Sequence, residues 1–220
     1  MHKVVTLRYC QFMNLSNPAY DVLGESAGRV LGRLAVLPDG ASGRRIHELS
    51  GVATLRTTQR LLDQFVRIGL VDMHAIGKAH RYTLNREHLL WKPVEILLEL
   101  PAAIESELIE VIESEFDGAV DHAILYGSFA RGTADDSSDI DVLIQWRDDA
   151  GSPDDLAQIV ERAVSRVRER TGNSAHFLGV NRAELQRLIA AGDPLVDSLR
   201  REGRALAEGT DIADLLRSDR

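Results

Sequence analysis

The stretch Tyr126-Gly127-Ser128-Phe129-Ala130-Arg131-Gly132 decides the fold of this chain, together with Ser138-Asp139-Ile140-Asp141-Val142-Leu143-Ile144 a few residues later. The first stretch ends an apolar run over residues 120–126 with a glycine-serine turn, which predicts a buried strand and then a tight turn. In the second stretch, Asp139 and Asp141 are two residues apart, so on a strand their carboxylates face the same side. The pattern predicts two successive strands, the second with one polar and one apolar face.

The turn after the first strand has the groups that an anion site requires. Gly127 lets backbone amides approach a phosphate closely, and Ser128 adds a hydroxyl donor. A short helix beginning near Phe129 would direct its N-terminus at the same anion, and Arg131 is placed to neutralise phosphate charge. Two carboxylates can bind Mg²⁺ (or Mn²⁺) in the company of substrate phosphates. We therefore expect a nucleoside triphosphate and its metal ion here, the nucleotide held by Gly127, Ser128, Arg131 and Ser138, the metal by Asp139 and Asp141.

These two stretches resemble the DNA polymerase beta-like nucleotidyltransferase superfamily, and in particular the minimal nucleotidyltransferases. The resemblance covers about residues 118–208. It implies a short mixed sheet flanked by helices, with Asp139 and Asp141 as catalytic residues. The implied activity is transfer of a nucleoside monophosphate from an NTP to a hydroxyl, with release of pyrophosphate. Later segments fit that fold: a helix over 154–171, a strand over 175–180, and helices after Asn181 and Pro194.

One feature of the superfamily is missing. Its active members have a third acidic residue on the strand after the Asp pair, but residues 174–180 contain no acid. His176 is the one titratable group on that strand, and it could act as the base for the attacking hydroxyl or be an ordinary half-buried histidine. Two interpretations stay open: an active transferase, and a domain that senses a nucleotide without turnover.

The first half of the chain predicts a helix-turn-helix followed by a hairpin. A helical pattern over 22–37 ends at a Pro-Asp-Gly turn, Ser42 can cap a second helix, and Thr54 can cap a third that ends at Gly69. Strands over 70–75 and 80–84 enclose a Gly-Lys turn. A basic hairpin after such a helix is similar to the wing of winged-helix regulators of the ArsR kind.

The polar face of the third helix and the hairpin are the candidate interface with double-stranded DNA. Side chains at the N-terminal end of such a helix enter the major groove, and a wing contacts the backbone. The residues concerned are Thr54, Arg56, Thr57, Gln59, Arg60, Lys78, His80 and Arg81. The alternative interpretation is a solvated helix face and a polar hairpin used for protein contacts.

The two halves of the chain differ in net charge. Residues 1–92 have 13 Lys and Arg against 7 Asp and Glu, a net charge of +6, whereas residues 93–220 have 13 against 27, a net charge of −14. A basic half can meet a polyanion, and an acidic half needs cations to do so. Between the halves, residues 93–116 predict a long helix that Pro101 should kink or split. Its apolar stripe could pair with a second copy in a homodimer or pack on its own chain.

We therefore expect an α+β protein with four parts: a winged helix-turn-helix over 1–92, a helical connector over 93–117, a nucleotidyltransferase domain over 118–208 and a polar, flexible tail over 209–220. A lone cysteine, Cys10, and the absence of a long apolar run favour a cytoplasmic location without membrane contact. The expected function is a DNA-binding transcriptional regulator with a transferase domain. Family analogy adds a toxin–antitoxin component that modifies a protein or RNA partner.

Overall fold

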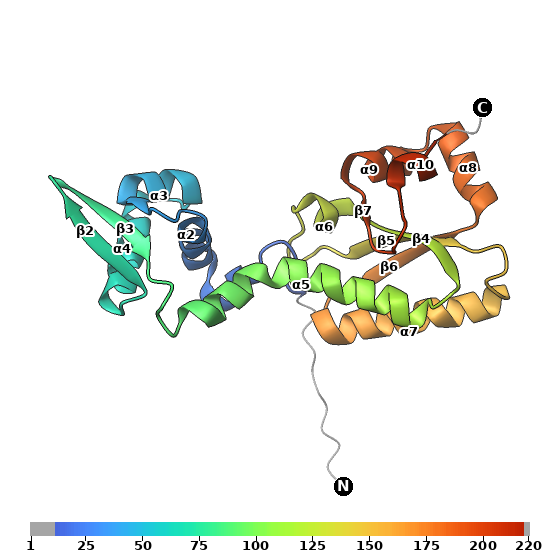
Figure 1. The fold of residues 1–220 in the computed structure, drawn as a ribbon, viewed down its shortest axis with the longest axis horizontal. Helices are drawn as coiled ribbons and strands as arrows, with labels where there is room; N and C mark the ends of the chain where they lie inside the picture. Colours follow the sequence, from blue (N-terminus) through green and yellow to red (C-terminus); the bar gives the residue numbers. More distant parts are fainter. Residues whose placement is uncertain (1–11, 218–220) are drawn as a thin grey trace, which may run out of the picture. The chain divides into compact units, whose positions relative to one another are not determined.

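The computed structural model describes residues 12–217 and divides the chain into two compact units (Figure 1). The N-terminal unit comprises residues 17–102, and the C-terminal unit comprises residues 103–220 together with residues 1–16. Cys10 lies outside the described residues. The chain is an α+β protein, as the sequence predicted: helices with a small antiparallel sheet come first, and a mixed sheet flanked by helices follows.

The N-terminal unit packs helices and a three-stranded antiparallel sheet, in the order β1-β3-β2, around one apolar core. Leu34, Ile46 and Leu62, each fully buried, come from three different helices and form the centre of this core. Its elements are α1 (Ala19–Leu23), α2 (Glu25–Ala35), β1 (Ala41–Ser42), α3 (Gly43–Ser50), α4 (Leu55–Arg67), β2 (Val71–Ile76) and β3 (Ala79–Leu84).

The predicted helix caps are present. The Ser42 hydroxyl accepts a hydrogen bond from the Arg45 amide at 3.3 Å, and the Thr54 hydroxyl accepts one from the Thr57 amide at 3.1 Å. The helix predicted in the second part of residues 22–37 is α2, and the short helix α1 precedes it because the chain turns at Gly24, whose φ of 80° favours glycine.

The C-terminal unit is a four-stranded mixed sheet in the order β6-β5-β4-β7, with helices on both faces (Figure 1). Strands β4 and β5 are antiparallel, and β5 and β6 are parallel. Helices α5 and α7 cover one face, and α8, α9 and α10 cover the other. The bounds are α5 (Trp91–Glu115, of which residues 103–115 belong to this unit), β4 (Val120–Tyr126), α6 (Gly127–Arg131), β5 (Ile140–Trp146), α7 (Pro153–Thr171), β6 (Ala175–Val180), α8 (Arg182–Ala191), α9 (Pro194–Glu202), β7 (Arg204–Ala205) and α10 (Ile212–Leu215).

Strand β5 alternates between the two halves of the core. Ile140, Val142 and Ile144 face α5 and α7, whereas Leu143 packs against α8 and α9. The same alternation places Asp141 and Gln145 on the face of Leu143, one toward each end of the strand. Both polar residues therefore lie on the side of the sheet that α8 and α9 cover.

Segments outside the predicted domain complete this core. Leu15 is fully buried beside α5, and the Asn173 side chain exchanges hydrogen bonds with the Met13 backbone at 3.2 and 2.9 Å. At the other end, Leu216 is buried against the α9 side of the sheet, so residues 209–217 pack on the domain where we expected a flexible tail.

Helix α5 runs continuously through Pro101, at which we expected a kink or a break. From Ile104 onward its apolar stripe is buried against the sheet of the same chain. Of the two alternatives, pairing with a second copy or packing on the same chain, this part of the stripe follows the latter.

Candidate active site

The candidate site forms where β4 ends and β5 begins. Because Tyr126 and Asp141 are register partners on these antiparallel strands, the turn at Gly127 lies directly beside the Asp141 carboxylate. Gly127 has a φ of +78°, and a Cβ at this position would lie 2.5 Å from Asp141 Oδ2. A side chain at residue 127 would displace this carboxylate, so both the backbone angle and the close approach require glycine.

The two acidic residues differ in environment. Asp139 is exposed just before β5, whereas Asp141 is half-buried on the strand. Burial raises the pKa of Asp141 above its ordinary value, because desolvation disfavours the charged form. The His176 side chain counteracts this increase, and the Asp139 carboxylate adds to it. Burial also raises the pKa of Tyr126, and the Asp141 charge contributes to that increase.

His176 lies on the neighbouring strand at the level of Asp141. The two residues are register partners on parallel strands β5 and β6, and Nδ1 of His176 is 4.0 Å from Oδ1 of Asp141. The imidazole is 67% exposed and can therefore reach solvent or a substrate. Phe177 faces the core on the α5 and α7 side of the sheet. Because neighbouring residues of a strand face opposite sides, His176 is directed to the other face, the one that carries Asp141.

Arg131, the expected phosphate ligand, contacts a carboxylate that sequence reasoning missed. Its Nη1 donates to Oε1 of Glu202 at 2.5 Å, and the Ser198 hydroxyl donates to the same oxygen at 2.5 Å. The hydrogen bond from Ser198, followed by the contact with Arg131, lowers the pKa of Glu202. Glu202 ends α9, 71 residues from Arg131, so no local pattern reveals the pair.

The remaining candidate residues lie close to this turn. Ser128 is the second residue of α6 and is half-buried. Ser138 stabilises the loop before β5, because its hydroxyl accepts from the Asp135 amide and donates to Oδ1 of Asp135, both at 3.0 Å. Ser138 thus has a structural role in addition to the expected one.

The residues at this edge suit a hard divalent cation bound together with a nucleotide. Mg²⁺ usually takes one or two protein carboxylates and completes its shell with water and substrate phosphates, and Asp139 and Asp141 supply that number. Within residues 12–217, no three His, Cys, Asp or Glu side chains form a metal-binding group on their own. A metal here would therefore complete its shell with water and triphosphate oxygens.

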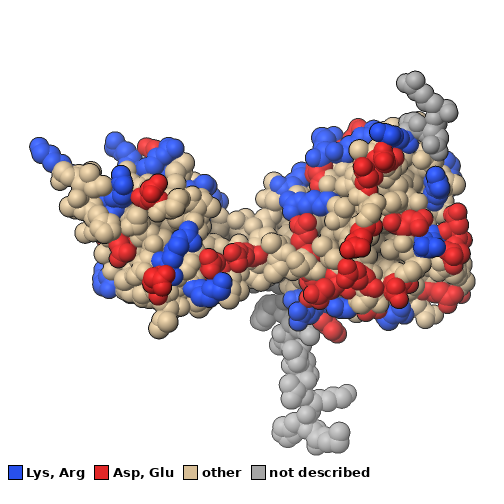
Figure 2. Space-filling view, in the orientation of Figure 1, with Lys and Arg blue, Asp and Glu red and all other residues tan. Residues whose placement is uncertain are grey.

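The candidate DNA-facing residues all lie in the N-terminal unit. Arg56 and Arg60 are exposed along α4, and Lys78, His80 and Arg81 are exposed on the β2–β3 hairpin. Lys and Arg side chains of this unit are visible on the face shown in Figure 2, and Asp and Glu are abundant on the other unit.

Three other candidates on α4 already have hydrogen-bond partners in this unit. Thr54 and Thr57 form the helix cap, with 2.9 Å between their hydroxyls. The Gln59 amide donates to Asp63 at 2.9 Å and to the Tyr82 hydroxyl at 2.8 Å.

Comparison with protein families gives a match. Residues 105–184 match the family model of the nucleotidyltransferase domain. A solved structure described as "Crystal structure of the toxin-antitoxin with AMP-PNP" aligns over 51% of this chain and 78% of its own, at 18% identity and a TM-score of 0.34, a likeness too weak to indicate a ligand or partner. No curated protein sequence matches the chain. Over residues 105–184, the C-terminal unit is therefore similar to the nucleotidyltransferase domain family.

Among the described residues, no helix has both the length and the apolar composition needed to cross a bilayer.

Proposed function

We propose that the C-terminal unit binds an NTP with Mg²⁺ and transfers its nucleoside monophosphate to a hydroxyl of a protein, RNA or small molecule. The observation that carries this proposal is the contact between Gly127 and Asp141. A glycine turn able to receive phosphates lies directly against a half-buried carboxylate able to hold the metal. The family match over residues 105–184 supports the same chemistry.

In this proposal, the chain's own residues position the triphosphate and remove a proton. The backbone at Gly127 and the Ser128 hydroxyl donate to phosphate oxygens, and Arg131 offsets their charge. Bound divalent ions would supply positive charge at the triphosphate, held by Asp139 and Asp141. The acceptor oxygen forms a bond to the α-phosphorus while the bond to pyrophosphate breaks, and His176 takes the acceptor's proton.

The test has two stages. First, calorimetric titration of the full chain with each NTP and Mg²⁺ should show binding that Asp139→Asn and Asp141→Asn remove. Second, α-labelled NTP should transfer its label to an acceptor fraction, and the same variants should abolish this transfer. An absence of binding for every NTP would refute the proposal.

A second candidate function is favoured by one observation: β6 has an exposed histidine where the superfamily has an acid. In this alternative the unit senses a nucleotide without turnover. Binding in the calorimeter together with no label transfer to any acceptor would support it over the first candidate.

We further propose that the N-terminal unit is a winged helix that binds double-stranded DNA and gives the protein a regulatory role in transcription. The helix pair α3 and α4, followed by the β2–β3 hairpin, supports this proposal. The exposed cations Arg56, Arg60 and Arg81 are on the elements that such a domain presents to DNA. A mobility shift with a pool of random duplexes would test the proposal.

A further inference from the structure

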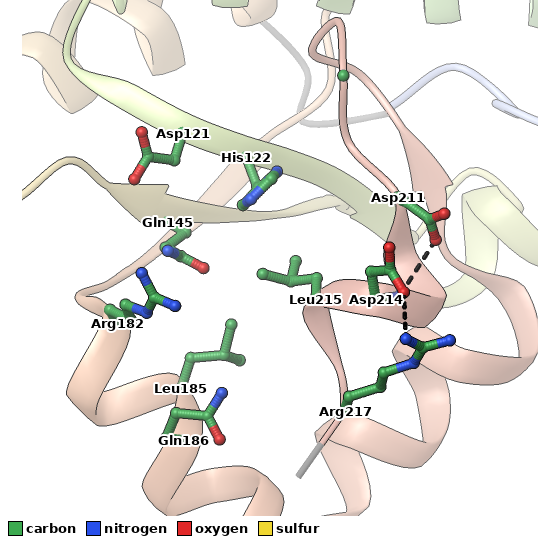
Figure 3. A pocket seen from close by; sticks show the side chains of 11 residues that line it. Asp121, His122, Gln145, Arg182, Leu185, Gln186, Asp211, Asp214, Leu215 and Arg217 are labelled. Carbon is green, nitrogen blue, oxygen red and sulfur yellow. Dashed lines mark hydrogen bonds and ion pairs between the residues drawn. The ribbon is translucent and has the colours of Figure 1, made fainter. Parts of the chain in front are cut away.

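The end of β5 opposite the candidate active site has a cavity of its own. Asp141, Leu143 and Gln145 share one face of the strand, so Gln145 lies four residues, or roughly 13 Å, from Asp141. Leu143, fully buried, separates the two. A cavity of about 320 Å³ opens beside Gln145 and is lined by residues of β4, β5, α8 and α10 (Figure 3). This volume lies at the lower end of the range for small-molecule sites.

Gln145 is the residue that makes this cavity unusual. Its side chain is only 4% exposed, and Oε1 has no hydrogen-bond partner among the described residues. A buried amide oxygen without a partner is unfavourable, and native structures keep few of them. Figure 3 shows the Gln145 amide directed into the cavity, with Arg182 and Leu215 facing the same space. Because Oε1 itself is buried, a donor from a bound molecule reaches it once the amide turns toward the cavity.

His122 lies directly opposite Gln145, as its register partner on β4. Its Nδ1 is 3.3 Å from the Thr210 hydroxyl, and burial lowers the pKa of the imidazole, which favours the neutral form. The deep part of the cavity is thus lined by neutral hydrogen-bonding groups, with Leu185 and Leu215 as apolar walls.

Two of the aspartates around the cavity already have partners in the structure. Asp211 caps α10 through two backbone amides, and Asp214 pairs with Arg217 at 3.0 Å. Arg182, which is exposed, forms no ion pair within the part of the chain that the structure describes. Asp121, at the start of β4, is exposed on the same rim. A guanidinium and a carboxylate therefore lie on either side of the buried amide, and the carboxylate also interacts with the charge of Arg147.

We infer that this cavity is a second ligand site, separate from the nucleotide site, that binds a small zwitterion of the amino-acid type. The ligand's carboxylate pairs with Arg182, its ammonium lies toward Asp121, and its polar side chain meets the Gln145 amide, which turns to present Oε1. Arginine suits a carboxylate because its planar fork donates two parallel hydrogen bonds. A phosphate dianion suits the rim less well, because three aspartates and two arginines line it.

The test is the thermal unfolding midpoint of the full chain, measured with each of the twenty L-amino acids at millimolar concentration and with the four nucleoside monophosphates. At least one amino acid should raise the midpoint by about 2 °C or more, as binding to the folded state alone requires. The increase should disappear in Arg182→Met and in Gln145→Met. Asp139→Asn, which alters only the nucleotide site, should keep it, so that failure of the transfer proposal leaves this one separately testable.

Gln145→Met also gives a readout that needs no ligand. Methionine has a similar length and no polar atom, so removing the unpartnered amide should leave the ligand-free midpoint unchanged or higher. A large decrease in the midpoint would show that Gln145 is a structural group and would overturn the inference. So would an absence of any shift with the amino acids, a shift that survives in both variants, or a shift with nucleoside monophosphates alone.

Discussion

The Asp141 carboxylate and the His176 imidazole lie side by side, 4.0 Å apart, because they are register partners on parallel strands β5 and β6. The histidine thus stands on the strand where the superfamily has its third acid. An imidazole at this position can serve as the base that accepts a proton from the attacking hydroxyl. This relationship makes His176 the one candidate base on β6.

Replacement of His176 should therefore change the pH dependence of transfer. We expect His176→Gln to lower kcat by roughly 100-fold or more, the usual effect of losing a general base. The increase in kcat/KM with pH that a histidine base produces should also flatten. His74→Gln, an exposed histidine of the β2–β3 hairpin, is the matched control and should leave the profile unchanged. A pH profile that keeps its shape in His176→Gln would exclude the proposed role.

The ionised carboxylate of Asp141 should lower the stability of the folded protein at neutral pH. Its pKa is raised in the folded state, chiefly by burial, so the folded protein binds its proton more tightly than the unfolded chain does. As pH rises through the interval above the ordinary value of 3.8, the folded state loses stability relative to the unfolded state. Asp141→Asn should therefore unfold at a higher temperature than wild type at pH 7.5 in the presence of EDTA.

The pH dependence of this difference checks its cause. Well below the ordinary pKa of 3.8 the carboxyl is protonated in both states, so the advantage of Asp141→Asn should shrink there. Asp139→Asn is the control, because Asp139 is exposed and no burial cost is removed. Equal stabilisation by the two variants at pH 7.5 would contradict the assignment to burial.

Gly127 should be essential for binding in a way that Gly132 is not. Both glycines have positive φ, 78° and 72°, so alanine at either position should cost about 1–2 kcal/mol of stability. A Cβ at residue 127 also meets Asp141 Oδ2, whereas a Cβ at residue 132 meets no atom within 4 Å. We expect calorimetry to show NTP binding lost in Gly127→Ala and kept in Gly132→Ala. Equal loss in both variants would indicate general damage to the turn.

Local sequence patterns were sufficient to predict the strands and the turn that form the candidate site. The alternation predicted β5 and the turn predicted the bend at Gly127, and the strand predicted over 175–180 is β6. Asp141 lies on β5 as expected, whereas Asp139 lies just before it. The caps at Ser42, Thr54 and Asn181 follow from short-range hydrogen bonds that sequence spacing reveals. These features depend on neighbours within a few residues.

Features that depend on distant contacts could not be predicted. The two-residue strands β1 and β7 are too short to give a periodic signal, and each exists because a longer strand offers a free edge. Leu15 and Leu216 are buried against elements far along the chain. The unpartnered amide of Gln145 likewise becomes visible only when β4, β5 and α8 are assembled.

The contact between Arg131 and Glu202 should compete with nucleotide binding. Glu202 is largely buried on α9 and holds the guanidinium that we expect to neutralise phosphate charge. Glu202→Gln should free Arg131 and tighten NTP binding by about two- to tenfold, because a charged hydrogen bond no longer has to be exchanged. Arg131→Ala should weaken binding. As a control, Glu208→Gln removes an exposed charge of the same sign and should change the calorimetric Kd little. If Glu208→Gln tightened binding as much as Glu202→Gln, long-range charge and not the contact with Arg131 would govern the affinity.

The basic face of α4 should determine any affinity for DNA. Arg56 and Arg60 are exposed near its N-terminal end, whereas Arg67 is exposed in the last turn of the same helix. If the N-terminal end enters the major groove, Arg56→Ala and Arg60→Ala should each weaken binding by about tenfold, the cost of one lost base contact, while Arg67→Ala has little effect. Lys78→Ala on the hairpin should reduce the slope of log K against log salt by about one, because it removes one phosphate contact. Fluorescence anisotropy with a selected duplex at several salt concentrations measures both quantities, and equal losses in all four variants would show that only net charge is sensed.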